Sequence, residues 1–200
     1  MIHLDKIAAF SRPTSLGDFD VTCFEAGGNI IFALSKGTLP QENLLVRVQS
    51  ACLFGEAFAV NSCDCGAQLN KALEIGAAES AFLLIYLQHQ EGRGHGMLQK
   101  IRVIEVEANQ HVDMFEAFQR LEMALDLREY HETAAIIKAL NGDLPIRLMT
   151  NNPKKIAGLA EHGITVAERV PLVIDPPNAA CKRYLQVKKD KMGHLLPDFE

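Results

Sequence analysis

Residues 81–97 of this chain read AFLLIYLQHQEGRGHGM. The first seven residues form a short, nearly unbroken apolar run, which is typical of a strand that is buried on both faces. The run leads into a loop with glycines at positions 92, 94 and 96, and we expect a helix from Met97 to about Glu107. A buried strand, a glycine-rich loop and a helix in this order indicate one unit of a parallel α/β sheet.

A second unit of the same kind follows later in the chain. A strand is expected over residues 146–149, and the polar loop 150–153 opens a helix over residues 154–161. Pro153 suits the first position of that helix, and Gly163 suits its C-terminal cap. Further strands are expected within residues 20–34, joined by a turn at Gly27-Gly28, and at 43–50 and 164–170, and further helices at 68–78, 113–125, 133–140 and 184–192.

These elements predict a mixed, mainly parallel sheet flanked by helices, an α/β fold in which residues 1–200 form a single domain. The sequence shows no internal repeat, low-complexity tract or linker that would divide the chain. In sheets of this kind, ligands bind beyond the carboxyl ends of the strands. We therefore expect the functional residues in the loops that follow residues 81–87 and 146–149.

Composition restricts the class of protein. Of the 200 residues, 48% are apolar and 22% are charged, which is the balance of an ordinary globular protein. The formal net charge of −5 argues against a general nucleic-acid-binding surface. No apolar run is long enough to span a membrane, and the N-terminus lacks a signal-peptide pattern. We expect a cytoplasmic protein with a small-molecule partner and with neither nucleic acid nor membrane as a partner.

Three of the five cysteines, Cys52, Cys63 and Cys65, lie within fourteen residues. Thiolates at this density are a ligand set for a soft metal ion, and three protein ligands leave a tetrahedral zinc ion one open position, as in catalytic sites. The alternatives are a disulfide or buried thiols. An odd number of cysteines, three of them clustered, suits a reducing compartment. We interpret Cys23 and Cys181 as ordinary thiols.

Two polar loops are candidates for nucleotide binding. In the first, residues 91–96, backbone amides near a helix start and the guanidinium of Arg93 can bind phosphate, although the glycines also suit a plain connecting turn. In the second, residues 150–155, Thr and Asn side chains can contact a base edge and a lysine can neutralise phosphate. Capping of the next helix explains Asn152 equally well.

Asp126 and Arg128 form a third candidate pair. A carboxylate near a zinc-bound water can move protons, and an arginine can bind a phosphate. The alternative is an ion pair on the surface. His89 and His95, near the glycine loop, could supply a proton or a fourth metal ligand, or could be merely solvated.

Taken together, these segments resemble the GTP cyclohydrolase II family, which begins riboflavin synthesis. The match follows the order of the family's motifs along nearly the whole chain. Its segments are residues 47–48 with Cys52, 63–69, 90–93, 100–102, 126–128, 150–155, 168–172 and 191–196.

The resemblance implies that the three clustered cysteines hold a catalytic Zn²⁺ that activates water for attack on C8 of guanine, which opens the imidazole ring and releases formate. It implies that Asp126 is the proton acceptor and that Arg128 is the nucleophile at the α-phosphate, where pyrophosphate leaves. It also implies Mg²⁺ with the triphosphate, and a homodimer. The residues that it implies in nucleotide contacts are Arg47, Gln68, Glu91, Gly92, Arg93, Thr150 and Lys155.

The chain departs from the family pattern at several positions. Ile104 stands where the family usually has a tyrosine, and Met114 and Phe118 replace a threonine and an asparagine. Ala51 replaces an acid beside the first cysteine. A site that hydrogen-bonds its substrate discriminates strongly when a partner is lost, so these changes suggest a paralogue that hydrolyses another purine or pyrimidine nucleotide. The other readings are tolerated drift, misalignment near Met114, and a non-catalytic nucleotide-binding protein.

Overall fold

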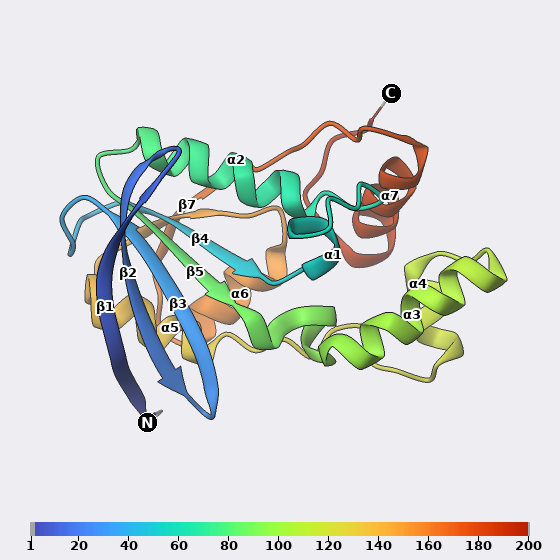
Figure 1. Cartoon of the computed structure of the whole chain (residues 1–200), viewed down its shortest axis with the longest axis horizontal. Helices are drawn as coiled ribbons and strands as arrows, with labels where there is room; N and C mark the ends of the chain where they lie inside the picture. The colour runs from blue at the N-terminus through green and yellow to red at the C-terminus, as the bar shows by residue number, and fades with distance from the viewer. Residues whose placement is uncertain (1–2, 200) are drawn as a thin grey trace.

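The computed structural model describes residues 3–199 of the chain. Seven strands form one sheet in the order β1-β2-β3-β5-β4-β6-β7, with helices on both faces and beyond one end (Figure 1). The expected mixed α/β sheet is confirmed. The strands are β1 (Leu4–Thr14), β2 (Gly17–Ala26), β3 (Asn29–Lys36), β4 (Leu44–Ser50), β5 (Phe82–Leu87), β6 (Ile146–Met149) and β7 (Val166–Val170).

The sheet has an antiparallel part and a parallel part. Strands β1, β2, β3 and β5 pair antiparallel in that order, whereas β5, β4, β6 and β7 run parallel. The predicted turn at Gly27-Gly28 joins β2 to β3, and both glycines have positive φ, 57° and 82°, as a two-residue hairpin turn requires. Because β4, β5 and β6 are parallel, their carboxyl ends lie at one edge of the sheet.

Helices cover both faces of the sheet. Helix α2 (Cys65–Ala78) packs on one face, where Ala72 contacts a core that includes Phe82 and Leu84. Helices α5 (His131–Asn141) and α6 (Pro153–Glu161) cover the other face. Gly76 of α2 lies against the Phe82 ring, where a Cβ would be 2.3 Å from a ring carbon, so this helix approaches β5 closely only because residue 76 is glycine.

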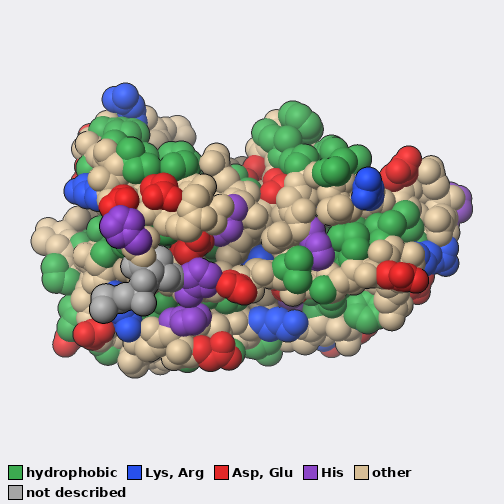
Figure 2. All heavy atoms as spheres, turned by 90° about the horizontal axis from the view of Figure 1, so that it is seen from below, with side chains coloured by type: hydrophobic (Ala, Val, Ile, Leu, Met, Phe, Trp, Pro, Cys, Tyr) green, Lys and Arg blue, Asp and Glu red, His purple; other side chains and the backbone are tan. Residues whose placement is uncertain are grey.

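A second group of helices lies beyond the carboxyl ends of the strands. Helices α3 (Gly96–Gln110), α4 (Met114–Arg120) and α7 (Ala179–Met192) share a small core around Val103, Phe118 and Met192 (Figure 1). The short helix α1 (Leu53–Glu56) and the 3-10 segment η1 (Gln88–Gly94) connect this group to the sheet. On the face shown in Figure 2, hydrophobic side chains lie at several places along the molecule, interspersed with acidic and basic ones.

Some predicted boundaries were wrong. The helix expected over residues 113–125 ends at Arg120, because the chain turns at Glu122, which has a positive φ of 54°. Helix α7 begins at Ala179 instead of residue 184, because the Asn178 side chain caps it by accepting from the Cys181 amide at 2.9 Å. Strand β1 was not predicted, because it is exposed along most of its length and lacks an alternating apolar pattern.

None of the helices described within residues 3–199 is both long enough and apolar enough to cross a membrane.

Candidate functional site

A cavity of about 850 Å³ lies where the carboxyl ends of the parallel strands face α3, α4 and α7. Residues directly after β4, β5 and β6 line it, which is the position expected for a ligand site in a parallel sheet. Most of the predicted site residues also line it. They are Cys52, Cys63, Cys65, Arg47, Gln68, Gly92, Arg93, Arg128, Thr150 and Lys155.

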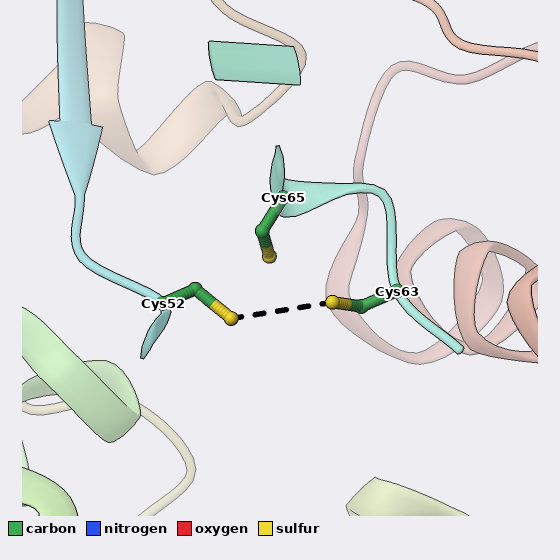
Figure 3. Close-up of side chains that lie close together, drawn as sticks. All are labelled: Cys52, Cys63 and Cys65. Atoms are coloured by element: carbon green, nitrogen blue, oxygen red, sulfur yellow. Dashed lines mark hydrogen bonds between the residues drawn. The ribbon is translucent and has the colours of Figure 1, made fainter. Parts of the chain in front are cut away.

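The three clustered cysteines converge in this cavity (Figure 3). All three sulfurs lie within 4.8 Å of one another, and those of Cys52 and Cys63 are 4.0 Å apart. Two thiolates bound to one tetrahedral zinc ion lie roughly 3.8 Å apart, so the spacing fits that ion. A disulfide would need about 2.05 Å between sulfurs, and all three thiols are free.

Two glycines let the cysteine segments approach each other. Cys52 follows β4, and Cys65 begins α2. A Cβ on Gly66 would lie 2.0 Å from the carbonyl oxygen of Gly55, and a Cβ on Gly55 would lie 3.0 Å from the Cys63 sulfur. The convergence of the thiols therefore depends on the absence of side chains at positions 55 and 66.

Buried basic side chains line the same cavity. Arg47 donates to Gln49 Oε1 at 2.6 Å and to Gln68 Oε1 at 2.8 Å, and burial lowers its pKa to about 10. Lys155 donates to the Val48 carbonyl at 2.6 Å, and burial together with nearby Arg47 and Arg128 lowers its pKa well below the usual value. Such a concentration of buried basic groups favours a polyanionic ligand, which stabilises their charged forms.

Asp126 and Arg128 form a buried pair, so the alternative of an ion pair on the surface does not hold. Arg128 Nε donates to Asp126 Oδ1 at 2.8 Å, and Nη2 donates to Oδ2 at 2.6 Å. Burial alone would raise the pKa of Asp126, but the guanidinium lowers it below the usual value. Arg128 lines the cavity, whereas Asp126 lies behind it and does not.

The glycine loop adopts the unusual backbone that its sequence suggested. Gly92, Gly94 and Gly96 have positive φ values of 60°, 87° and 79°, which accounts for all three glycines, and Arg93 shares this conformation with a φ of 60°. Gly92 and Arg93 line the cavity, but Glu91 does not. The Glu91 carboxylate instead accepts a hydrogen bond from the Leu53 amide at 2.8 Å and pairs with Lys100.

The family model for GTP cyclohydrolase II matches residues 5–171 of the chain. This chain belongs to the GTP cyclohydrolase II family. It is 40% identical over 197 residues to the GTP cyclohydrolase-2 of Neisseria meningitidis serogroup A, a match that covers 98% of both chains.

Other family relatives are longer proteins. The chain is 42% identical over 195 residues to the riboflavin biosynthesis protein RibBA of Aquifex aeolicus, and 43% identical over 197 residues to that of Bacillus subtilis. These matches cover 96% of this chain but 47% and 48% of the relatives. The chain therefore spans about half the length of these RibBA proteins.

The positions that depart from the GTP cyclohydrolase II pattern face the cavity. Ala51, Ile104, Met114 and Phe118 all line it. Met114 also accepts a hydrogen bond at its sulfur from Arg93 Nη2, at 2.9 Å. Met114 and its neighbours therefore give the wall an apolar region near the glycine loop.

Neither candidate histidine reaches the cavity. His89 Nε2 lies 3.0 Å from Glu132, and His95 Nε2 lies 2.7 Å from the carbonyl oxygen of Ala124. The lining histidines are His111 and His194 instead. Burial, followed by the charge of Lys188, lowers the pKa of His194 to about 3.

Sequence reasoning missed the contribution of α7 and of α3. Residues 184–192 were predicted as a basic terminal helix without a role, yet Tyr184 and Lys188 line the cavity. Lys188 pairs with the buried Asp64 at 2.7 Å, which ties α7 to the cysteine segment. From α3, Glu107 and Lys100 also face the cavity. The only sequence signal was the presence of residues 100–102 and 191–196 among the family motifs.

Proposed function

We propose that this protein opens the imidazole ring of GTP and releases formate and pyrophosphate, the reaction that gives the GTP cyclohydrolase II family its name. One observation carries the proposal. A single cavity is lined both by three thiols at metal-ligand spacing and by the basic side chains of Arg47, Arg128 and Lys155. The thiols would hold the metal ion that ring hydrolysis needs, and the basic side chains would bind the triphosphate.

The zinc ion of this proposal would be held by Cys52, Cys63 and Cys65, whose soft sulfur donors suit it. When bound, zinc supplies a Lewis acid that activates water at neutral pH. Arg47 and Lys155 would bind phosphate oxygens, and their position in the cavity wall supports this role. Gln68, Thr150 and the Gly92–Arg93 backbone add hydrogen-bonding groups along the same wall, while Glu91 acts through its contacts behind that wall.

The buried pair supports separate roles for its two members. Attack of an Arg128 nitrogen on the α-phosphate forms an N–P bond and breaks the P–O bond to pyrophosphate. The attacking nitrogen must lose a proton, and Asp126 Oδ2 lies 2.6 Å from Arg128 Nη2. This contact supports Asp126 as the acceptor of that proton, and water would then cleave the N–P bond.

We further propose that Mg²⁺ accompanies the triphosphate, and that residues 1–200 act as a single domain in a cytoplasmic homodimer. The support is the family resemblance together with the polyanion-suited cavity. Light scattering of the purified protein tests the dimer, and dependence of turnover on Mg²⁺ tests the second metal.

The test of the reaction is incubation of zinc-loaded protein with GTP and Mg²⁺. We expect formate and pyrophosphate in equal amounts and a product whose mass matches the ring-opened nucleotide. Protein with zinc at full occupancy that releases no formate above background would contradict the proposal.

A second candidate is the same hydrolysis of another purine or pyrimidine nucleotide. The apolar wall formed by Ile104, Met114 and Phe118 favours it, because these residues offer no hydroxyl or amide to a guanine base. A nucleotide panel read by product mass separates the candidates. Binding without turnover of any nucleotide would instead support a non-catalytic protein.

A further inference from the structure

Lys100 joins the cysteine cluster to the glycine loop. From α3, its Nζ donates a hydrogen bond to the sulfur of Cys52 at 3.1 Å and pairs with the Glu91 carboxylate. Glu91 in turn accepts from the backbone amide of Leu53, the residue directly after Cys52, at 2.8 Å. The contacts therefore form a closed ring that joins Lys100, Glu91 and the Cys52–Leu53 segment.

The surroundings hold this lysine in place. Its side chain is 15% exposed and that of Glu91 is 10% exposed, so water does not screen the pair strongly. The ammonium lies 5.4 Å from the centre of the Phe54 ring. The backbone of the glycine loop packs directly on the lysine stem, where a Cβ on Gly92 would be 3.0 Å from Lys100 Cβ.

We propose that Lys100 is a positioning residue of the metal centre, which hydrogen-bonds the Cys52 ligand sulfur and thereby reduces the electron density that this thiolate donates to the ion. The inference rests on the proposed zinc function. Three thiolates around a divalent ion leave a net charge of about −1, which weakens the ion as a Lewis acid. One ammonium against one sulfur offsets that charge.

The same contacts give the lysine a second effect. Glu91 precedes Gly92 and Arg93, which line the cavity, and the Glu91–Lys100 pair fixes where this loop begins. The metal ligand and the loop proposed to bind nucleotide are therefore held by one side chain. A change at Lys100 should alter both the electronic state of the metal and the position of Arg93.

Cobalt substitution tests the electronic effect without turnover. The variants are Lys100→Met, which keeps the length without the charge, and Lys100→Arg, which keeps the charge. Loss of the hydrogen bond raises the energy of the sulfur lone pairs, so we expect the sulfur-to-cobalt charge-transfer band of K100M to move to longer wavelength. The band of K100R should stay near that of the unsubstituted protein.

A second readout is the pH profile of formate release. With the cation removed, we expect the acidic limb of the K100M profile to move up by roughly one pH unit. Lys71→Met is the matched control, because Lys71 lies on the exposed side of α2 and pairs only with Glu74 at 3.4 Å among the residues that the structure describes. Its spectrum and profile should be unchanged.

The outcomes separate this inference from the proposed reaction. Unsubstituted protein that binds neither zinc nor cobalt overturns both proposals. Protein that binds cobalt but shows the same band in K100M overturns the role of Lys100 alone. If K100M does not fold, Lys100→Leu carries the same comparison, since it also removes both the charge and the hydrogen-bond donor, and an unshifted band there overturns the inference.

Discussion

Arg128 donates from Nε and Nη2 to the two carboxylate oxygens of Asp126, at 2.8 and 2.6 Å, across a turn of only two residues. Both side chains are largely buried, with 11% and 7% of their surfaces exposed. The carboxylate thus fixes the plane of a guanidinium that faces the cavity. A planar fork of this kind cannot be reproduced by an ammonium group.

This geometry makes Arg128→Lys a sharp test. We expect kcat to fall about 100-fold or more, because lysine keeps the charge but loses the two-point contact and the guanidinium nitrogen. The matched control is Arg147→Lys, because Arg147 pairs with Glu79 at 2.6 Å and does not line the cavity. Steady-state kinetics with GTP measure both, and an unchanged kcat in R128K would refute the role proposed for the pair.

The cysteine cluster predicts the metal content of variants. Cys63→Ser should reduce bound zinc from about one per chain to a small fraction, because a hydroxyl is a poor ligand for this ion. Elemental analysis of protein purified without chelator measures it. Cys23→Ala, at a thiol in the sheet outside the cluster, should keep its zinc. Equal zinc in both variants would exclude the three-thiolate site.

From the lowered pKa of Lys155, we expect the protein to take up a proton when it binds nucleotide. Its pKa is held well below the usual value by burial and by Arg47 and Arg128. Phosphate oxygens beside it favour the charged form, so nucleotide binding should raise the pKa of Lys155 and be accompanied by proton uptake, and a pH series shows where the uptake is greatest. Calorimetry with a non-hydrolysable GTP analogue, repeated in buffers of different ionisation enthalpy, measures the uptake.

The test variant and its control for this experiment change two adjacent lysines. Lys155→Met should reduce both the proton uptake and the affinity for the analogue, whereas Lys154→Met, at an exposed position, should change neither much. Proton release on binding, or equal uptake in K155M and the unsubstituted protein, would disprove the role of Lys155.

From the raised pKa of Glu107, we expect the free energy of unfolding to depend on pH. Burial, followed by the charge of Asp113, raises its pKa to about 7. Between the unfolded value near 4.5 and pH 7, the unfolded chain releases a proton that the folded protein retains, so stability falls as pH rises through this window. Glu107→Gln has no carboxyl group to ionise, so its stability does not fall for this reason as the pH rises. With allowance for solvent screening, we expect it to be about 1–2 kcal/mol more stable than the unsubstituted protein at pH 8.

Urea denaturation between pH 4 and pH 8 measures this difference. The gain should vanish near pH 4, where the carboxyl is protonated in both states. Glu105→Gln, at an exposed position of the same helix, is the control and should show little gain at any pH. A gain of equal size at pH 4 and pH 8 would show that the effect does not arise from ionisation of Glu107.

Much of this fold was predictable because its signals are local. The apolar run before Gln88, the loop opening at Pro153 and the Gly27-Gly28 turn each specify an element within a few residues. Strand β1 was missed because it has no such local signal. It is held by pairing with β2 and leaves Ile7 and Phe10 exposed, so it has no burial pattern to detect.

The proximity of the three thiols was also predictable from sequence, since they lie within fourteen residues and two glycines allow their segments to approach each other. The walls of the cavity were not. Tyr184 and Lys188 come from a helix more than a hundred residues away from the cysteines, and its docking depends on the buried Asp64–Lys188 pair. No local periodicity reports such a contact.

The sequence by itself determined the strand–loop–helix order, the three cysteines and the family, because these depend on residue type and spacing along the chain. Only the tertiary structure decided which side of each loop faces the cavity. It directs Arg128 into the cavity and Asp126 behind it, and it pairs Glu91, a predicted nucleotide contact, with Lys100. The reason is that a buried polar group must find a partner, and the available partners come from elements far apart in sequence.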